Sequence, residues 1–249
     1  FGSTWSEVDV APSLNPYWYD IAITPDGKNM VVGDYNMGLL YASTDSGVNW
    51  TAYGPTRSWW PVASSSDFTK LVAMEYGGNI WRSTDSGVTW TEITTTGDAK
   101  QWFGITMSSD GTKLAAFVKN NNIWTSSDSG VTWTEDTSVG VTKDWKGITS
   151  TADGTKLAAT VNNGNIWSSD DSGATWTEVT VGDGTNAWRG ITFSADGTKL
   201  AAVVSGYNIW TKMETLISGS SSEATPIDGT GAGATFNNPK GITIDSTDT

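Results

Sequence analysis

Apolar and polar positions repeat along this chain with a period of about 43 residues. Each period opens with a tryptophan followed by a short apolar stretch, and the openings are Trp18, Trp59, Trp102, Trp145 and Trp188. Three more short apolar stretches follow in each period. Asp-Gly pairs mark a turn after the first stretch at 26–27, 110–111, 153–154 and 196–197. Asp67-Phe68 takes that place in the second period, so its turn is expected to differ. The pattern predicts four short strands per period and almost no helix, because no stretch keeps apolar residues at a spacing of 3.6.

A sheet of four strands has two faces, and a single sheet cannot bury both. We therefore predict an all-β fold, a β-propeller of four-stranded antiparallel blades, with the recurring Trp and Ile side chains packed between neighbouring blades. A linear solenoid of the same sheets is the alternative architecture. The chain holds about five such blades, and we expect six or seven in the full ring.

The expected blades cover residues 11–52, 53–95, 96–138, 139–181 and 182–225. Trp-Ser-Glu-Val near the start matches Trp-Thr-Glu-Val at 176–179 in a fourth strand. We therefore expect residues 1–10 to supply the outer strand of a closing or preceding blade. Residues 226–249 begin a further blade that does not finish, so the chain is expected to be a segment of a longer protein.

The phrase Ser-x-Asp-x-Gly-x-x-Trp recurs four times in phase with the repeat and resembles the Asp-box, or bacterial neuraminidase repeat. Its residues are Ser43, Asp45, Gly47, Trp50, Ser83, Asp85, Gly87, Trp90, Ser126, Asp128, Gly130, Trp133, Ser169, Asp171, Gly173 and Trp176. The resemblance implies a propeller architecture like that of the sortilin and sialidase superfamily, with each box as the hairpin between the third and fourth strands. The Asp can accept backbone N–H groups, the Gly can adopt a positive φ, and the Trp can fold back as an apolar plug. We therefore interpret the boxes as structural, rather than catalytic or calcium-binding.

The sequence changes after Trp210, where the box disappears. The stretch 228–246 resembles the opening of an NHL-type propeller repeat, because Asn238-Pro239-Lys240-Gly241-Ile242 takes the place of Trp188-Arg189-Gly190-Ile191 in the blade before. The resemblance implies that the chain passes from Asp-box blades into an NHL-like blade.

Composition excludes several classes of chemistry. The chain has 14 Lys and Arg against 27 Asp and Glu, and its formal net charge of −13 argues against nucleic acid or an anionic membrane as a partner. It has no Cys and no His, so it has no thiol nucleophile, no zinc-thiolate site and no histidine base. No apolar run approaches the roughly 20 residues of a membrane span. We expect neither a cofactor nor a bound metal.

Sialidase activity is the enzymatic function that the Asp-box resemblance suggests first. That family needs three converging arginines and a Tyr–Glu pair. Arg57, Arg82 and Arg189 are the three arginines of this chain, and they fall at different phases of the repeat. We therefore do not expect a sialidase.

Three carboxylates stand where the later blades carry glycine or valine. Asp20 replaces the Gly of the first strand, while Asp34 and Glu75 replace the Val of the second strand. If the three met between the first two blades, they could serve as the acid and base of a glycoside hydrolase, or bind Ca²⁺ through oxygen ligands. The alternative, which we favour, is a solvated rim.

Aromatic residues gather at the starts of the first two blades, where Tyr17, Trp18, Trp59 and Trp60 occur with Arg57 nearby. Exposed rings of this kind can stack on sugars or contact a protein. Trp60 is the one tryptophan out of phase with the repeat, and the alternative to binding is that it covers the neighbouring blade.

Near-identity among the third, fourth and fifth blades favours a scaffold, since an active site needs different residues in different roles. The exterior rich in Ser, Thr, Gly and Asn favours an extracellular or cell-surface location, and Asn49 begins an N-glycosylation sequon. We expect a non-catalytic extracellular module that acts as a structural scaffold or adhesion surface and binds proteins or glycans through its loops. The alternatives are a glycoside hydrolase that uses Asp20, Asp34 or Glu75, and a filament subunit whose copies pack on one another.

Overall fold

The computed structural model describes residues 6–10, 15–140, 142–182, 186–206, 209–213 and 225–226. These residues form antiparallel strands joined by turns and loops, and none of them lies in a helix. The prediction of an all-β chain is therefore confirmed for the described residues. The chain divides into two compact units, residues 1–102 and residues 103–249.

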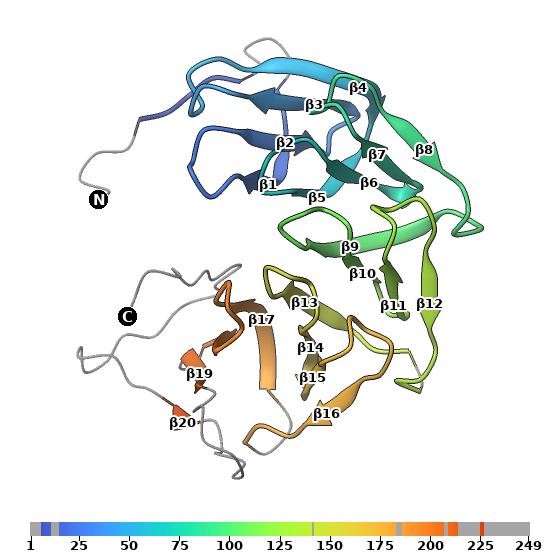
Figure 1. Ribbon diagram of the computed structural model, residues 1–249, viewed down its shortest axis with the longest axis vertical. Coiled ribbons are helices and arrows are strands. Elements are labelled where there is room, and N and C mark those ends of the chain that lie inside the picture. Colours follow the sequence, from blue (N-terminus) through green and yellow to red (C-terminus); the bar gives the residue numbers. More distant parts are fainter. Residues whose placement is uncertain are drawn as a thin grey trace. The chain divides into compact units, whose positions relative to one another are not determined.

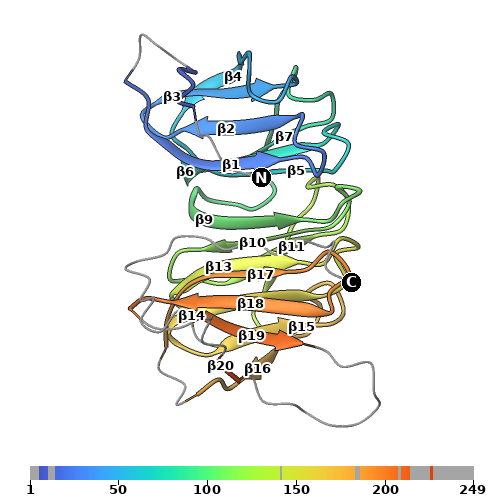
Figure 2. The ribbon, with the colours of Figure 1, turned by 90° about the vertical axis from the view of Figure 1, so that its left-hand side faces the viewer.

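The first unit contains two complete four-stranded sheets, in which neighbouring strands run antiparallel (Figures 1 and 2). The first sheet has the order β1 (Trp18–Ile23), β2 (Met30–Asp34), β3 (Gly38–Ser43) and β4 (Thr51–Arg57). The second has the order β5 (Trp59–Ser64), β6 (Leu71–Gly78), β7 (Ile80–Ser83) and β8 (Thr91–Ile93). The far end of β6 also pairs with the start of β9 (Lys100–Met107), with Tyr76 opposite Gln101.

The second unit repeats this plan three times. After β9 come β10 (Leu114–Val118), β11 (Ile123–Ser126) and β12 (Thr134–Asp136), and then β13 (Trp145–Ser150), β14 (Leu157–Gly164), β15 (Ile166–Ser169) and β16 (Thr177–Val179). The last set is β17 (Asn186–Phe193), β18 (Lys199–Val204), β19 (Ile209–Met213) and the short β20 (Thr225–Pro226). Each strand pairs antiparallel with the one before it within its set.

The tryptophan that opens a period is buried between two sheets. Trp59 is 0% exposed and packs with Leu40 of the preceding sheet and Leu71 of its own sheet. Trp145 packs in the same way against Phe117 of β10, and Trp188 against residues of both β14 and β18. Burial of an indole contributes several kcal/mol, about 3–5 by comparison with Trp-to-Ala substitutions. The predicted role of these side chains between sheets is confirmed at these positions.

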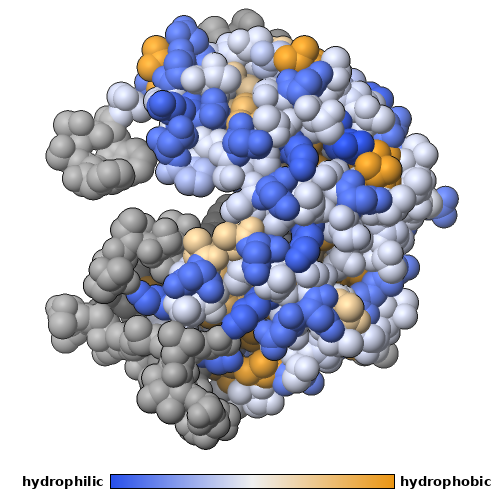
Figure 3. Space-filling view, viewed as in Figure 1, coloured by the Kyte–Doolittle hydropathy of each residue, from blue (hydrophilic) through white to orange (hydrophobic). Residues whose placement is uncertain are grey.

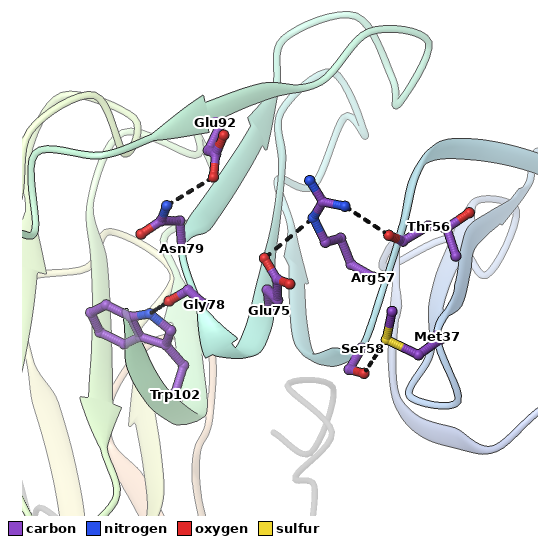
Figure 4. Close-up of polar contacts among 9 residues, drawn as sticks. All are labelled: Met37, Thr56, Arg57, Ser58, Glu75, Gly78, Asn79, Glu92 and Trp102. Carbon is purple, nitrogen blue, oxygen red and sulfur yellow. Dashed lines mark hydrogen bonds and ion pairs between the residues drawn. The ribbon is translucent and has the colours of Figure 1, made fainter. Parts of the chain in front are cut away.

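Three of these indoles also satisfy their polar group against the preceding sheet. The Nε1–H of Trp102 donates to the carbonyl of Gly78 at 3.2 Å (Figure 4), that of Trp145 to the carbonyl of Asn121 at 2.8 Å, and that of Trp188 to the carbonyl of Gly164 at 2.9 Å. Each acceptor lies at the junction between the second and third strands of its sheet. At Trp145 and Trp188 the indole therefore joins two sheets through both apolar contact and a hydrogen bond.

Trp18 differs from the other four opening tryptophans, because it is 36% exposed. On the same strand Ile21 is 55% exposed, whereas Ile191, which holds the equivalent position on β17, is 7% exposed. The face of the first sheet that carries Trp18 is therefore not covered by another sheet within the described residues. Its indole contacts Tyr41 edge-to-face at 5.4 Å.

The turn between the first and second strands has the same form in every sheet, which corrects the expectation for the second one. In the first sheet the Thr24 hydroxyl donates to Asp26, and Gly27 adopts a φ of +72°. Ser65 and Asp67 make the same contact in the second sheet, where Phe68 takes the glycine position with a φ of +62°. The turn does not differ, because burial of the Phe68 ring, which is only 2% exposed, offsets the strain of a left-handed conformation.

The four box sequences form equivalent loops between the third and fourth strands. In the first, the buried Ser43 hydroxyl donates to Asp45 at 2.9 Å and accepts the Gly47 N–H at 2.9 Å, while Asp45 accepts the Asn49 N–H at 2.8 Å. The Trp50 Nε1–H folds back to the Gly47 carbonyl at 2.9 Å. The serine and aspartate contacts recur in the boxes that begin at Ser83, Ser126 and Ser169. The box glycines have φ values of +84°, +89°, +79° and +88°, so each needs the conformation that glycine adopts most easily.

The structure differs from the prediction at residues 6–10 and at the limit of the first blade. Residues 6–10 form no strand, in contrast to the expected outer strand, because no second strand pairs with them among the described residues; residues 1–5 lie outside the description. β4 continues to Arg57, past the expected blade limit at residue 52, because it stays paired with β3 as far as Gly38. The NHL-like stretch lies outside the described residues.

Candidate binding site

Asp20 links the first two sheets through hydrogen bonds to the backbone. Its Oδ2 accepts the N–H of Val62 on β5 at 3.0 Å, and its Oδ1 accepts the N–H of Ile21 at 3.0 Å. Burial raises the pKa of Asp20, and the two N–H donors oppose that shift. The carboxylate therefore holds β1 against β5.

Asp34 lies at the end of β2 and is 2% exposed. Its Oδ1 accepts the backbone N–H groups of Tyr17 and Asn36, each at 2.9 Å. Asp34 thus fastens the segment before β1 to the turn between β2 and β3. A buried carboxylate with two backbone donors is a positioning group for the residues that it holds.

Glu75 makes an ion pair instead. Its Oε2 lies 3.4 Å from Nε of Arg57, at the end of β4 (Figure 4). The Arg57 guanidinium also lies 5.5 Å from the ring centroid of Trp81, and its Nη1 donates to the Thr56 carbonyl at 3.0 Å. The predicted binding residue Arg57 therefore connects β4 to the second sheet.

Asp20, Asp34 and Glu75 thus have three different sets of partners. Among the described residues, no group of three or more Asp or Glu side chains is arranged to hold a metal ion. The structure does not gather the three into the cation site considered from the sequence. Each carboxylate instead has its own partners, which are backbone N–H groups for Asp20 and Asp34 and the Arg57 guanidinium for Glu75.

An open pocket lies beside these carboxylates in the first unit. Its volume is about 480 Å³, and its walls are the rings of Tyr17, Tyr19, Tyr35 and Trp60. Asn15, Pro16 and Asn36 complete the lining. This volume falls within the range of small-molecule sites, roughly 300–1,000 Å³.

Irregular backbone positions these rings. The pairing of β1 with β2 shifts register between Trp18 and Ile21, and that of β5 with β6 shifts between Trp59 and Val62. Bulges of this kind redirect side chains at sites. Tyr19 and Trp60 lie inside the two shifted stretches. Their side chains therefore meet each other, while Trp59 faces the packing between the two sheets and Trp18 lies on the uncovered face of the first sheet.

The pocket rings pack against one another at interplanar angles from 38° to 82°. Tyr19 lies 3.6 Å from Trp60 between ring centroids, with an interplanar angle of 38°. Tyr35 meets Trp60 edge-to-face at 5.1 Å and 82°, and lies 5.9 Å from Tyr17 at 60°. Tyr76 stacks on Trp60 from the second sheet at 4.9 Å and 24°. Packing of these rings on one another fixes the walls before any ligand arrives.

The surroundings of Tyr19, on the pocket wall, are acidic. Burial raises the pKa of its hydroxyl, and the nearby Asp20 carboxylate and the Tyr17 hydroxyl raise it further. Within the described residues, no Lys or Arg lines the pocket. The pocket therefore combines aromatic faces with a negative electrostatic environment.

The structure divides the aromatic residues predicted from the sequence. Tyr17 and Trp60 line the pocket, whereas Trp59 is fully buried between sheets and Trp18 contacts Tyr41 on the uncovered sheet face. Trp60 also packs against Tyr19 and Tyr35 of the neighbouring sheet, in agreement with the alternative interpretation that it covers the neighbouring blade.

Sequence reasoning missed Tyr19, Tyr35 and Tyr76. Comparison of the periods contains the signal, because Tyr19 and Trp60 share one repeat position, and Tyr35 and Tyr76 share another. The later periods carry Phe103, Lys146 and Arg189 at the first of these positions.

Asn49, the predicted glycosylation residue, is exposed in the first box, and its Nδ2 donates to Asp45 Oδ2 at 2.7 Å. On the face drawn in Figure 3, hydrophobic residues form small separate patches among hydrophilic and intermediate ones. The described residues contain no helix long and apolar enough to span a membrane.

Comparison with known proteins defines the fold. No family model matches the chain, and no curated protein matches it. Among solved structures, YCF48 from Cyanidioschyzon merolae is similar with a TM-score of 0.64 and 13% identity, over 88% of this chain and 73% of that one. A GH74 enzyme from Niastella koreensis matches with a TM-score of 0.60 and 19% identity over 77% of this chain, and the GH74 xyloglucanase from Xanthomonas campestris with 0.64 and 10% over 84%.

The chain spans only 35% and 38% of the two GH74 proteins. A structure of YCF48 bound to D1 peptide is also similar, with a TM-score of 0.60 and 15% identity over 81% of this chain and 66% of that one. At these identities the likeness shows the fold alone. Together with the four-stranded antiparallel sheets, it confirms that the chain has the β-propeller fold.

Proposed function

We propose that this chain is a non-catalytic, extracellular β-propeller module of the Asp-box type, which binds a protein or glycan partner at the aromatic pocket of its first two blades. The observation that carries the proposal is the pocket itself, a preformed volume of about 480 Å³ walled by four aromatic rings. Preformed aromatic pockets with few polar groups are typical of binding sites.

The arrangement of the acidic residues supports a non-catalytic role. A glycoside hydrolase needs two carboxyl groups that face each other across the scissile bond. Here both oxygens of Asp20 accept backbone N–H groups, Asp34 is buried under two such donors, and Glu75 is paired with Arg57. These contacts give each of the three carboxyl groups a structural partner, and the three groups have no partner in common.

The repeated loops support the Asp-box assignment and the scaffold role. Each box aspartate accepts hydrogen bonds from its own loop, and the serine and aspartate contacts are the same in four blades. The indole bond to the box glycine forms in the first three boxes but not at Trp176. Side chains that serve their own hairpin in this way stabilise the module rather than contact a ligand. Variation is concentrated at the other end of the sheets, where the pocket lies.

Glycoside hydrolysis is the second candidate, and one observation favours it. Burial raises the pKa of Asp20, as the general acid of such an enzyme requires, and Asp20 adjoins the pocket ring of Tyr19. The similarity to GH74 structures adds the fold but no site residues.

The experiment compares wild type with two matched leucine variants of adjacent aromatic residues. Tyr19→Leu removes a pocket wall, and Trp18→Leu alters the neighbouring side chain that points away from the pocket. The proteins are applied to a glycan array and a peptide array, and are incubated with soluble polysaccharides, including xyloglucan, while reducing ends are measured.

We expect wild type and Trp18→Leu to bind the same ligands, Tyr19→Leu to lose them, and no protein to release reducing ends. Release of reducing ends by wild type but not by Asp20→Asn would replace the proposal with the hydrolase. Concentration-dependent assembly in sedimentation velocity, with neither array showing binding, would favour the filament subunit instead.

A further inference from the structure

The pocket is lined by the rings of Tyr17, Tyr19, Tyr35 and Trp60, and among the described residues no Lys or Arg lines it. Tyr17 and Tyr19 remain 59% and 44% exposed, so their rings are accessible. The face of an aromatic ring carries a negative quadrupole that attracts cations within about 6 Å of its centroid. A ligand for these four rings has to match this property.

The repeat provides an internal comparison. Tyr19 and Tyr35 in the first blade hold the positions that Phe103 and Lys119 hold in the third. There the Lys119 ammonium lies 5.1 Å from the centroid of Phe103. The same pair of positions thus supplies a ring and its cation in the third blade, but two rings in the first, so a cation over the rings of the first blade has to come from elsewhere, such as a ligand.

The protein uses the same contact elsewhere. The Lys143 ammonium lies 4.6 Å from the ring centroid of Trp167, and the Arg57 guanidinium lies 5.5 Å from that of Trp81. Cations over rings are therefore a recurrent stabilising contact in this fold, and the pocket offers four rings around one space.

Charge at the pocket favours a cation as well. Asp20 links the strands that carry Tyr19 and Trp60, and Asp34 accepts the backbone N–H of Tyr17. Both carboxyl groups therefore hold segments of backbone that carry the pocket rings. The whole chain has a formal net charge of −13, which raises the local concentration of cationic ligands.

The angles between the rings separate this pocket from a flat sugar-stacking platform. Tyr35 stands at 82° to Trp60 and at 60° to Tyr17. Tyr19 and Tyr76 pack against Trp60 at 3.6 Å and 4.9 Å between ring centroids, so Trp60 supports the wall from behind. The tilted rings in front of it suit a compact, rounded group that touches more than one ring. A trimethylammonium group has this shape, and its methyl groups also gain from apolar contact with the walls.

We propose that the aromatic pocket formed by Tyr17, Tyr19, Tyr35 and Trp60 is a cage for a trimethylammonium group, as found in choline and in Nε-trimethyllysine. This inference rests on the proposed function only in using the same pocket, and it specifies the chemistry that the pocket recognises. The rings supply cation–π contacts, and the carboxyl groups behind them supply the long-range attraction.

The experiment titrates the purified protein by isothermal calorimetry with choline, with Nε-trimethyllysine, and with 3,3-dimethylbutan-1-ol, a neutral molecule of the shape of choline. Cation–π contacts of about 0.5–2 kcal/mol distinguish charge from shape. We expect choline or Nε-trimethyllysine to bind about tenfold more tightly than the neutral alcohol. The better of the two cations identifies the source of the group.

Variants locate the binding. Tyr19→Leu is expected to weaken binding of the preferred cation about fivefold or more, while Trp18→Leu changes it less than about twofold. Tyr17→Leu alters a ring that is 59% exposed and keeps the backbone N–H to Asp34, so it serves as a second pocket variant if Tyr19→Leu does not fold.

Equal affinity for the cations and the alcohol, or no saturable binding of any of the three, overturns the inference. Equal loss in Trp18→Leu and Tyr19→Leu also overturns it, because the site would not be this pocket. A glycan or peptide without an ammonium group that binds and is lost in Tyr19→Leu would refute the cage while leaving the proposed function in place.

Discussion

Replacing Phe68 with glycine and, separately, with alanine tests how the second blade tolerates a bulky residue in a left-handed turn. Phe68 has a φ of +62° at the position where the first blade has Gly27 at +72°. An L-residue in this conformation costs roughly 1–2 kcal/mol, which glycine avoids. The ring is only 2% exposed and belongs to the core cluster around Trp59, and loss of a buried Phe costs about 3–5 kcal/mol.

These two magnitudes give an order of stability. Phe68→Ala loses the ring and keeps the strain, so we expect a loss of about 3–5 kcal/mol. Phe68→Gly also loses the ring, but it relieves the strain of about 1–2 kcal/mol at a cost of about 0.5–1 kcal/mol in conformational entropy of the unfolded chain. We therefore expect Phe68→Gly to be more stable than Phe68→Ala by up to about 1.5 kcal/mol. Glycine should therefore exceed alanine here, while both remain less stable than wild type.

Urea unfolding followed by tryptophan fluorescence measures the three proteins, with the free energy of unfolding taken by linear extrapolation. Gly27→Ala is the control, because a Cβ there meets no atom within 4 Å and so reports the strain alone. Alanine at position 68 more stable than glycine would refute the strain argument. Glycine as stable as phenylalanine would show that the buried ring contributes nothing.

Three further changes test other parts of the structure. Hydrogen bonds from Thr175 and Ser169 lower the pKa of Asp171 from 3.8 to about 2. The stability that the ionised Asp171 contributes above about pH 4 should therefore be lost as the pH falls from about 4 to about 2. Thermal unfolding across a pH series measures this loss, with Asp171→Asn as the comparison. Ser126→Ala leaves the buried Gly130 N–H without its acceptor at 3.0 Å and should cost about 1–3 kcal/mol by urea unfolding. Glu75→Gln breaks a partly exposed ion pair and should change the free energy of unfolding by less than about 1 kcal/mol in the same assay.

The repeated part of the fold could be predicted because the same residues recur in the same order. The period placed the strands, and the tryptophan at its start marked the contact between sheets, as Trp59, Trp145 and Trp188 show. The conformations needed in the box also followed from its chemistry, since only a short acidic side chain and a glycine suit that hairpin.

The pocket could be predicted only in part. Tyr17 and Trp60 were identified as unusual, but register shifts after Trp18 and Trp59 decide which rings turn together, and a sequence pattern does not show such shifts. The carboxylates were identified by their positions, yet their roles depend on backbone N–H groups that come from residues far away in the chain, such as Val62 for Asp20. Phe68 was misjudged because tertiary burial outweighs local preference.

At one end of each of the first four blades, a backbone hydrogen bond joins the two turns. The N–H of Ser46 donates to the carbonyl of Lys28 at 2.8 Å, and Ser86, Ser129 and Ser172 do the same in the following blades. Both partners of each of these bonds come from one period, so every one of these blades carries its own clasp between the two turns. A second set of bonds links neighbouring periods, since the Ser109 N–H donates to the carbonyl of Ala152 at 2.7 Å and the Ala152 N–H to that of Ala195 at 3.0 Å. Deletion of the fourth period would therefore leave the clasps of the other blades intact, but would take away the acceptor of Ser109.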